Sequence, residues 1–370
     1  MKVVFDFNPI LQNRNFNSNT VGTKLLYNLA KSEKCPEIKL FYNQRYNSVM
    51  TSLRSKLSTR FRLCPDHGNS FMRKLSWKFF NSPELTQYTG RFDVFHSFDT
   101  YRPPIGNRPY LLSVFDLSCF MLPRLYTNRE REQLQSAIMN ADRLITVSDT
   151  MTLQIMELFE VPEDKISRIY LAPDSNLQNI SPDKVDAARE AIAQLTKSYC
   201  DYFSVIVTPQ VGKNLKNIIK AFLSVKFPPS VRLVLTGRLP NDRELMRLIV
   251  DNSEQIVATG EVEDYNAIIA GSRGLIYLPF YDAVALPVLN SLRLSVPVLA
   301  SDIPTLREIT DELAFFARPD DVEEIAKGFR SLATDPNQVK EFKEKGFWHS
   351  LEFHWKYSVQ ETIEVYSELV

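Results

Sequence analysis

The sequence predicts an α/β protein built from two doubly wound domains. Short apolar runs that fit buried strands alternate with stretches of helical periodicity along the chain, and this alternation is typical of parallel sheets. A polar helical stretch without a strand pattern, residues 176–199, interrupts the series once. With 370 residues, the chain is long enough for two cores. We therefore expect domains at 1–178 and 179–354 and a C-terminal helix at 355–370.

The first domain is predicted from six short apolar runs that fit buried strands. These strands are 2–6, 38–42, 92–96, 110–115, 143–148 and 165–171. Between them, Leu25, Leu26 and Leu29 recur at helical spacing. Ser148 suits the N-cap of a further helix.

The second domain is organised around residues 274–308. The predicted strands of this domain are 203–208, 231–236, 256–258, 274–279, 296–300 and 315–317. After strand 274–279 comes a loop with Asp282, then a helix that starts near Pro287, since proline suits the first helical turn. Ligands of parallel sheets bind beyond the carboxyl ends of the strands. Asp282 and Asn290 lie at that edge, so we expect a nucleotide pocket there.

Composition excludes several classes of protein. Hydrophobic residues make up 44% of the chain, charged residues 24%, and the net charge is zero, as in soluble globular proteins. No apolar run reaches the roughly 18 residues of a membrane span. The four cysteines include no C-x-x-C pair, which suits a reducing cytoplasm. There is no D-x-D, so no metal is expected. With 11 glycines and no G-x-G-x-x-G, phosphate binding would fall to helix ends and basic side chains.

The segment 45–80 is strongly basic. From Arg45 to Lys78 there are eight Lys or Arg and one Asp, 8 − 1 = +7. Residues 71–80 mix these cations with large apolar side chains, which fits a helix that rests on an anionic membrane surface. The alternative is an exposed basic helix whose aromatic side chains pack into its own domain. No nucleic-acid-binding pattern accompanies the charge, so nucleic acid is not an expected partner.

Seven short motifs, in order along nearly the whole chain, resemble the retaining, family-4-like glycosyltransferases. The motifs are Asp6 with Val21-Gly22, Val114-Phe115-Asp116-Leu117, 141–148, Ala172-Pro-Asp174, Gly212-Lys213-Asn214-Leu215, 298–308 and Phe353-His-Trp355. The resemblance implies the GT-B fold: two facing Rossmann-like domains, with the last helix crossing back to the first. The first domain would bind the acceptor and the second the nucleotide sugar.

The resemblance also assigns roles in donor binding. The matching lysine of the family contacts the diphosphate, which implies this role for Lys213, beside a helix start near Asn214. Asp282 and Asn290 stand where the family has two glutamates, so Asp282 would contact the donor sugar and Asn290 the ribose. An amide lacks the charge-assisted bonds of a carboxylate, so donor binding should be weaker by about 1–2 kcal/mol. Gly22 and Leu286 complete the expected donor site.

Candidate catalytic residues are Asp116, His96 and Asp282. The family's histidine before Asp116 is Phe115 here. Asp116 or His96 could orient an acceptor hydroxyl, although His96 would equally fit a partly buried structural histidine. In the family, the leaving phosphate is usually pictured as taking the acceptor proton, so a side-chain base is not required.

The sequence thus predicts a cytoplasmic glycosyltransferase, and the basic segment leaves open a peripheral position on the inner face of a membrane. It would move a sugar from a nucleotide sugar, such as a UDP- or GDP-sugar, to a glycan or a lipid-linked acceptor, without a cofactor. The alternative is a catalytically degenerate homologue that acts as a binding partner, because the motif E-G-F-G-L-P-x-L-E has become Asp282-Ala-Val-Ala-Leu-Pro-Val-Leu-Asn290.

Overall fold

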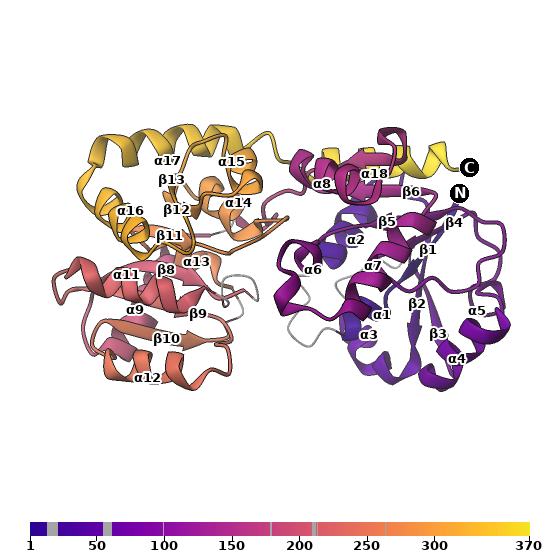
Figure 1. The fold of residues 1–370 in the computed structure, drawn as a ribbon, viewed down its shortest axis with the longest axis horizontal. Coiled ribbons are helices and arrows are strands. Elements are labelled where there is room, and N and C mark those ends of the chain that lie inside the picture. Colours follow the sequence, from indigo (N-terminus) through magenta and orange to yellow (C-terminus); the bar gives the residue numbers. More distant parts are fainter. Residues whose placement is uncertain are drawn as a thin grey trace. The chain divides into compact units, whose positions relative to one another are not determined.

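The chain divides into two compact units. The computed structural model describes residues 1–12, 21–54, 61–98, 100–177, 180–208, 212, 214–262 and 264–370. The first unit comprises Met1–Tyr170 and Trp355–Val370, and the second comprises Leu171–His354 (Figure 1). The boundary predicted from the sequence is residue 178, whereas the first stretch of the first compact unit ends at Tyr170.

The first unit contains a parallel sheet of seven strands in the order β3-β2-β1-β4-β5-β6-β7. The strands are β1 (Lys2–Asp6), β2 (Glu37–Asn43), β3 (Arg62–Asp66), β4 (Val94–Ser97), β5 (Tyr110–Ser113), β6 (Arg143–Thr146) and β7 (Ile166–Arg168). The order reverses between β1 and β4, which is the switch point of a doubly wound sheet.

Strand β3 is a strand that the apolar pattern of the sequence does not predict. Its residues, Arg62–Asp66, lie in the basic segment and include Pro65. Charge and proline are typical of an edge strand, and β3 forms one of the two edges of the sheet. A search for apolar runs does not find such a strand.

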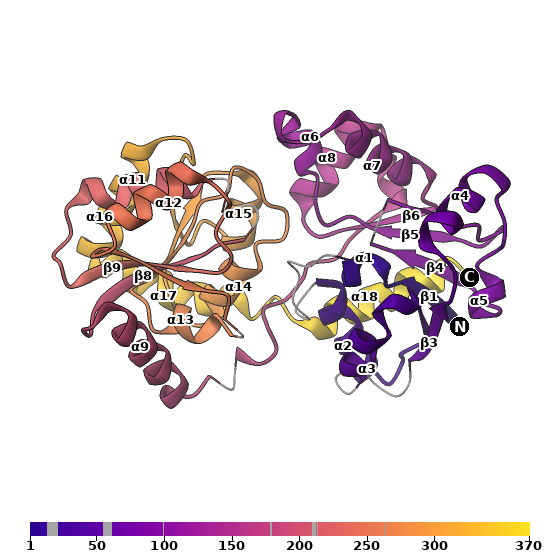
Figure 2. The ribbon, with the colours of Figure 1, turned by 90° about the horizontal axis from the view of Figure 1, so that it is seen from below.

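Helices pack on the first sheet, including the last helix of the chain. They are α1 (Asn8–Gln12), α2 (Val21–Lys31), α3 (Asn47–Arg54), α4 (Ser70–Phe80), α5 (Thr86–Thr89), α6 (Ser118–Met121), α7 (Asn128–Asn140), α8 (Asp149–Phe159) and α18 (Trp355–Glu368). Helix α18 packs against α2 (Figure 2), and its Tyr366 is fully buried. The expected return of the last helix to the first domain is confirmed.

The second unit is a parallel sheet of six strands in the order β10-β9-β8-β11-β12-β13. Its strands are β8 (Asp201–Ile206), β9 (Val231–Thr236), β10 (Ile256–Gly260), β11 (Gly274–Tyr277), β12 (Val298–Ser301) and β13 (Phe315–Ala317). Its helices are α9 (Pro182–Thr196), α11 (Leu215–Val225), α12 (Arg243–Asp251), α13 (Asn266–Ala270), α14 (Leu286–Arg293), α15 (Pro304–Thr310), α16 (Val322–Thr334) and α17 (Pro336–Ser350). Helices cover both faces, with α11, α12 and α16 on one and α9, α13 and α17 on the other (Figure 2). The switch point lies between β8 and β11.

Within the described part of the chain, no helix has both the length and the apolar character needed to pass through a membrane.

Candidate functional site

The switch point of the second unit brings together two of the loops that the motifs predict. Strands β8 and β11 are neighbours in the sheet. The loop after β8 leads into α11, and the loop after β11 leads into α14. Neither α11 nor α14 has a side-chain cap at its N-terminus, whereas α12 and α16 are capped by Asp242 and Asp321. Uncapped helix N-termini at a switch point leave N–H groups for an anionic ligand.

Asp282 is held rigidly in the loop after β11. The Tyr277 hydroxyl donates to its Oδ2, and the Val284 N–H donates to its Oδ1 over 3.1 Å. Burial, with the Asp282 charge beside it, raises the pKa of Tyr277 well above its usual value, so the phenol stays protonated and keeps donating. The carboxylate is buried and fixed by its neighbours, which suits a group that must be placed accurately before a ligand arrives.

The end of the same loop keeps an unusual backbone conformation. Ala285 has φ = 48°, in the left-handed region. The family has glycine at this position, the residue type that adopts this conformation without a steric penalty. Alanine thus replaces the family's glycine here, yet the backbone is still left-handed. Ala285 directly precedes Leu286, the first residue of α14.

Asn214 joins the two loops. Its Nδ2 donates to the carbonyl oxygens of Leu278, at 2.8 Å, and Pro319, at 2.7 Å. Its Oδ1 accepts from Asn217 Nδ2. The buried amide therefore ties the start of α11 to the end of β11. Lys213, the residue before it, lies outside the described residues, so its predicted role stays a prediction.

Asn290 lies on α14 and is completely buried. Its Oδ1 accepts from the backbone N–H of Asp174 at 2.9 Å. Its Nδ2 donates to Asn266 Oδ1, also at 2.9 Å, and Asn266 Nδ2 donates to Asp174 Oδ2 at 3.2 Å. The amide at 290 closes a ring of three residues, in which a donor toward Asn266 is required. In this conformation Asn290 connects α14 to Asp174 and Asn266 by hydrogen bonds and has no exposed surface for a ribose.

His96 belongs to the core of the first unit. It is fully buried, with Nδ1 2.8 Å from the Tyr366 hydroxyl and Nε2 2.7 Å from Ser113 Oγ. Burial lowers its pKa to about 3, so the ring is neutral at physiological pH. This geometry corresponds to the structural alternative, because His96 joins β4 to α18 and has no exposed surface that an acceptor could reach.

Asp116 and Gly22 occupy different environments in the first unit. Asp116 is exposed in the loop after β5, and its Oδ1 accepts from the Ser118 N–H at 2.7 Å. Gly22 is packed tightly, since a Cβ there would lie 2.6 Å from Ile10 Cδ1 and 3.0 Å from Phe98 Cε2. Close packing on α2 explains this glycine. Asp116, in contrast, is accessible to an acceptor.

Three side chains that shape the second unit's site carry no functional signal in the sequence. Tyr277 fits only an apolar strand, and Asn266 belongs to no motif. Asp174 belongs to the motif Ala172-Pro-Asp174, which implies no role for it. Tyr277 donates a hydrogen bond to Asp282, while Asp174 and Asn266 are hydrogen-bonded to Asn290 and to each other. These partners are distant in the sequence or carry no motif, so only the three-dimensional structure identifies them.

Comparison with known proteins agrees with the fold and the motifs. Residues 202–347 match the family model described as "Glycosyl transferases group 1". The chain is 24% identical to O-antigen chain mannosyltransferase B of Escherichia coli over 395 residues, covering 100% of both chains. The chain is a glycosyltransferase of the GT-B fold.

Two further likenesses extend this result. The glycosyltransferase is 22% identical over 242 residues to the O-antigen chain mannosyltransferase RfbU of Salmonella typhimurium, covering 64% of each. Its fold matches the crystal structure of Anabaena Alr3699/HepE in complex with UDP-glucose with a TM-score of 0.77, at 15% identity and with 100% of both chains covered. The predicted resemblance to glycosyltransferases and the predicted fold class are therefore confirmed.

Proposed function

We propose that this glycosyltransferase transfers mannose from a nucleoside diphosphate sugar to a glycan or lipid-linked acceptor, with retention of configuration and without a metal ion. The choice of mannose is supported by the two relatives named as O-antigen chain mannosyltransferases. A nucleoside diphosphate sugar as donor is supported by the structural neighbour in complex with UDP-glucose. The proposed place of action is the cytoplasm, on the inner face of the membrane that holds the acceptor.

The observation that carries the proposal is the switch point of the second unit. Two uncapped helix N-termini and a fixed carboxylate, Asp282, lie at the loops after β8 and β11. The N–H groups there favour the two negatively charged phosphates. In our proposal Lys213 adds a cation beside α11, while Asp282 accepts hydrogen bonds from the donor sugar.

The proposed transfer balances without a side-chain base. The acceptor hydroxyl oxygen forms a bond to the anomeric carbon as the bond from that carbon to the diphosphate oxygen breaks. The proton of the hydroxyl passes to the departing diphosphate. Lys213 and the helix N-termini stabilise the negative charge that develops on the leaving group, and Asp116 orients the acceptor hydroxyl. His96 has no place in this scheme because it is buried and neutral.

Calorimetric titration of the protein with UDP, GDP and ADP tests the proposal directly. One of the three should bind, and Lys213→Ala should weaken that binding by roughly tenfold or more, since a charge-assisted contact is lost. Lys216→Ala is the matched control. Lys216 lies in the first turn of α11, three residues after Lys213 in the sequence, and it pairs with Asp242 and Glu244, so its loss should change the affinity by less than about threefold.

Each outcome of the titration has a distinct meaning. If no nucleotide binds at millimolar concentration, the binding-partner alternative replaces the enzyme. If a nucleotide binds and Lys213→Ala has no larger effect than Lys216→Ala, Lys213 is not part of the diphosphate site. A screen of nucleotide sugars for hydrolysis or transfer then identifies the sugar.

A further inference from the structure

Helix α4 presents an apolar face that nothing in the described structure covers. Phe71, Leu75 and Phe79 are spaced four residues apart, and Met72 lies beside them. With about 100° per residue, these four side chains span an arc of roughly 100° on one side of the helix. Phe71 is 71% exposed, Met72 60% and Phe79 65%. Large apolar side chains gathered on one face in this way mark an interaction surface.

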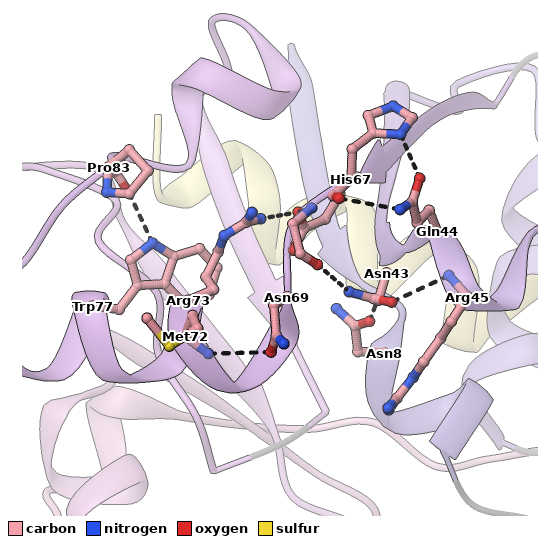
Figure 3. Close-up of polar contacts among 12 residues, drawn as sticks. Asn8, Asn43, Gln44, Arg45, His67, Asn69, Met72, Arg73, Trp77 and Pro83 are labelled. Atoms are coloured by element: carbon pink, nitrogen blue, oxygen red, sulfur yellow. Dashed lines mark hydrogen bonds and ion pairs between the residues drawn. The ribbon is translucent and has the colours of Figure 1, made fainter.

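The opposite face of α4 is fixed to the first unit. These contacts prevent the helix from rotating to bury its apolar side chains. Figure 3 shows the contacts. Asn69 caps the helix by accepting from the N–H groups of Phe71 and Met72. Arg73 forms an ion pair with Asp66, and both side chains are nearly buried. Trp77 Nε1 donates to the Pro83 carbonyl at 2.9 Å. These contacts orient the apolar arc toward solvent.

This arrangement corrects the alternative in which the aromatic side chains of the segment pack into their own domain. Trp77 does so, since it is buried and stacks on Tyr101. The phenylalanines at 71, 79 and 80 do not, because each remains at least 65% exposed. The rest of the described first unit therefore leaves the apolar face of α4 uncovered.

Charge along the exposed face indicates which partner. Lys74 and Lys78 are exposed beside the apolar arc, and no ion pair with a carboxylate of the described residues involves either of them. Helix α4 contains no acidic residue. Arg73, in contrast, is paired with Asp66 and adds no free charge to this surface. Apolar side chains bordered by lysines without ion pairs suit a surface in which a negatively charged outer layer covers an apolar interior.

We infer that α4 docks on an anionic lipid surface, with Phe71, Met72, Leu75 and Phe79 entering the boundary of the acyl chains and Lys74 and Lys78 meeting the phosphate headgroups. The inference deepens the proposed function, because it names the surface that would bring the enzyme to a lipid-linked acceptor. The geometry of α4 does not depend on nucleotide binding, so the two proposals can fail separately.

Co-sedimentation of the full chain with vesicles tests the inference. One set of vesicles contains phosphatidylcholine alone, and the other contains equal parts of phosphatidylcholine and phosphatidylglycerol. The double variant Phe71→Ser/Phe79→Ser should lose binding to the mixed vesicles by roughly tenfold or more. Lys74→Gln/Lys78→Gln should lose the preference for phosphatidylglycerol and the sensitivity to salt.

Leu153→Ser is the matched control, because Leu153 is an apolar side chain on α8 of the same unit and is 57% exposed. It should bind vesicles as the wild-type protein does. All variants replace exposed side chains, so their melting temperatures should stay close to that of the wild type. The inference is overturned if the wild-type protein binds neither kind of vesicle, or if the phenylalanine variant binds as well as the control. Nucleotide affinity, measured without lipid, reports separately on the proposed function.

Discussion

The left-handed backbone at Ala285 allows a sharp test of how the donor loop is built. An ordinary buried alanine loses stability when it is changed to glycine. The buried methyl group is worth about 0.8 kcal/mol, and the added freedom of the unfolded chain costs about 0.4–1 kcal/mol. At Ala285, however, glycine also removes a strain of roughly 1–2 kcal/mol, because a Cβ is disfavoured at positive φ.

Ala285→Gly should therefore leave the free energy of unfolding within about 1 kcal/mol of the wild-type value. Ala283→Gly is the matched control. Ala283 is buried in the same loop, stands where the family has its other glycine, and does not share the positive φ. That change should cost about 1–2 kcal/mol.

Thermal and urea unfolding of the two variants provide the measurement. For a unit of this size, 1 kcal/mol corresponds to roughly 2–4 °C in Tm, so the control should melt several degrees below Ala285→Gly. Equal destabilisation by the two substitutions would show that Ala285 is not strained. The left-handed backbone at Ala285 would then no longer support the interpretation that the loop keeps the family's conformation without its glycine.

Three further predictions concern buried polar groups. Burial lowers the pKa of His96 to about 3, below an unfolded value of about 6.5, so the unfolded chain binds the proton more readily and stability falls as the pH drops below 6.5. Between pH 6.5 and 4.5, His96 should lower the free energy of unfolding of the wild type by about 2 kcal/mol, and His96→Gln should remove this part of the loss. The assignment would be contradicted if the free energies of unfolding of the two proteins differed by the same amount at both pH values. Asn290→Ala should lower the free energy of unfolding, measured with urea, by about 2–4 kcal/mol, because two buried partners lose their hydrogen bonds. The control is Asn252→Ala. The half-buried Asn252 side chain donates one hydrogen bond, to the Leu248 carbonyl oxygen, so its loss should cost about 1 kcal/mol or less. Asp282→Asn should leave nucleoside diphosphate affinity unchanged and lower kcat/KM for transfer by roughly 10–100-fold, since the charge-assisted bonds to the donor sugar are lost; equal kcat/KM values would remove Asp282 from the sugar site.

The sequence was sufficient for the fold wherever a strand is buried on both faces. Such strands read as continuous apolar runs, and those at 203–206 and 274–277 were found within a few residues of their bounds. It was not sufficient at the sheet edge, where β3 carries charge and a proline. The position of the switch point also follows from the order of the strands, which no local pattern contains.

The candidate site was only partly predictable, because its polar network joins distant segments. Motif positions led to Asp282 and Asn290, but not to what surrounds them. Asn290 contacts Asp174 and Asn266, which are 116 and 24 residues away in sequence. Burial distinguishes His96 from Asp116 as well. His96 lies within β4 and Asp116 in the loop after β5 of the same sheet, yet one lies in the core and the other is exposed.

The replaced motif residues affect different parts of the donor site. At Ala285 the left-handed backbone is present without glycine, and at Asp282 a carboxylate is still present and is fixed by two donors. At Asn290 the charge is gone, and both atoms of the amide are engaged within the protein. The proposed losses therefore fall on the ribose and not on the diphosphate or the sugar.

This difference predicts weak recognition of the ribose. Where a carboxylate accepts from a ribose hydroxyl, removing that hydroxyl costs roughly 10–100-fold in affinity, because a charge-assisted bond is lost. With Asn290 buried and engaged, the 2′-deoxy form of the preferred nucleoside diphosphate should bind within about threefold of the ribose form. Calorimetry with the two nucleotides measures the ratio. A loss of tenfold or more would mean that another group accepts from the 2′-hydroxyl, and that the amide at 290 has not ended recognition of the ribose.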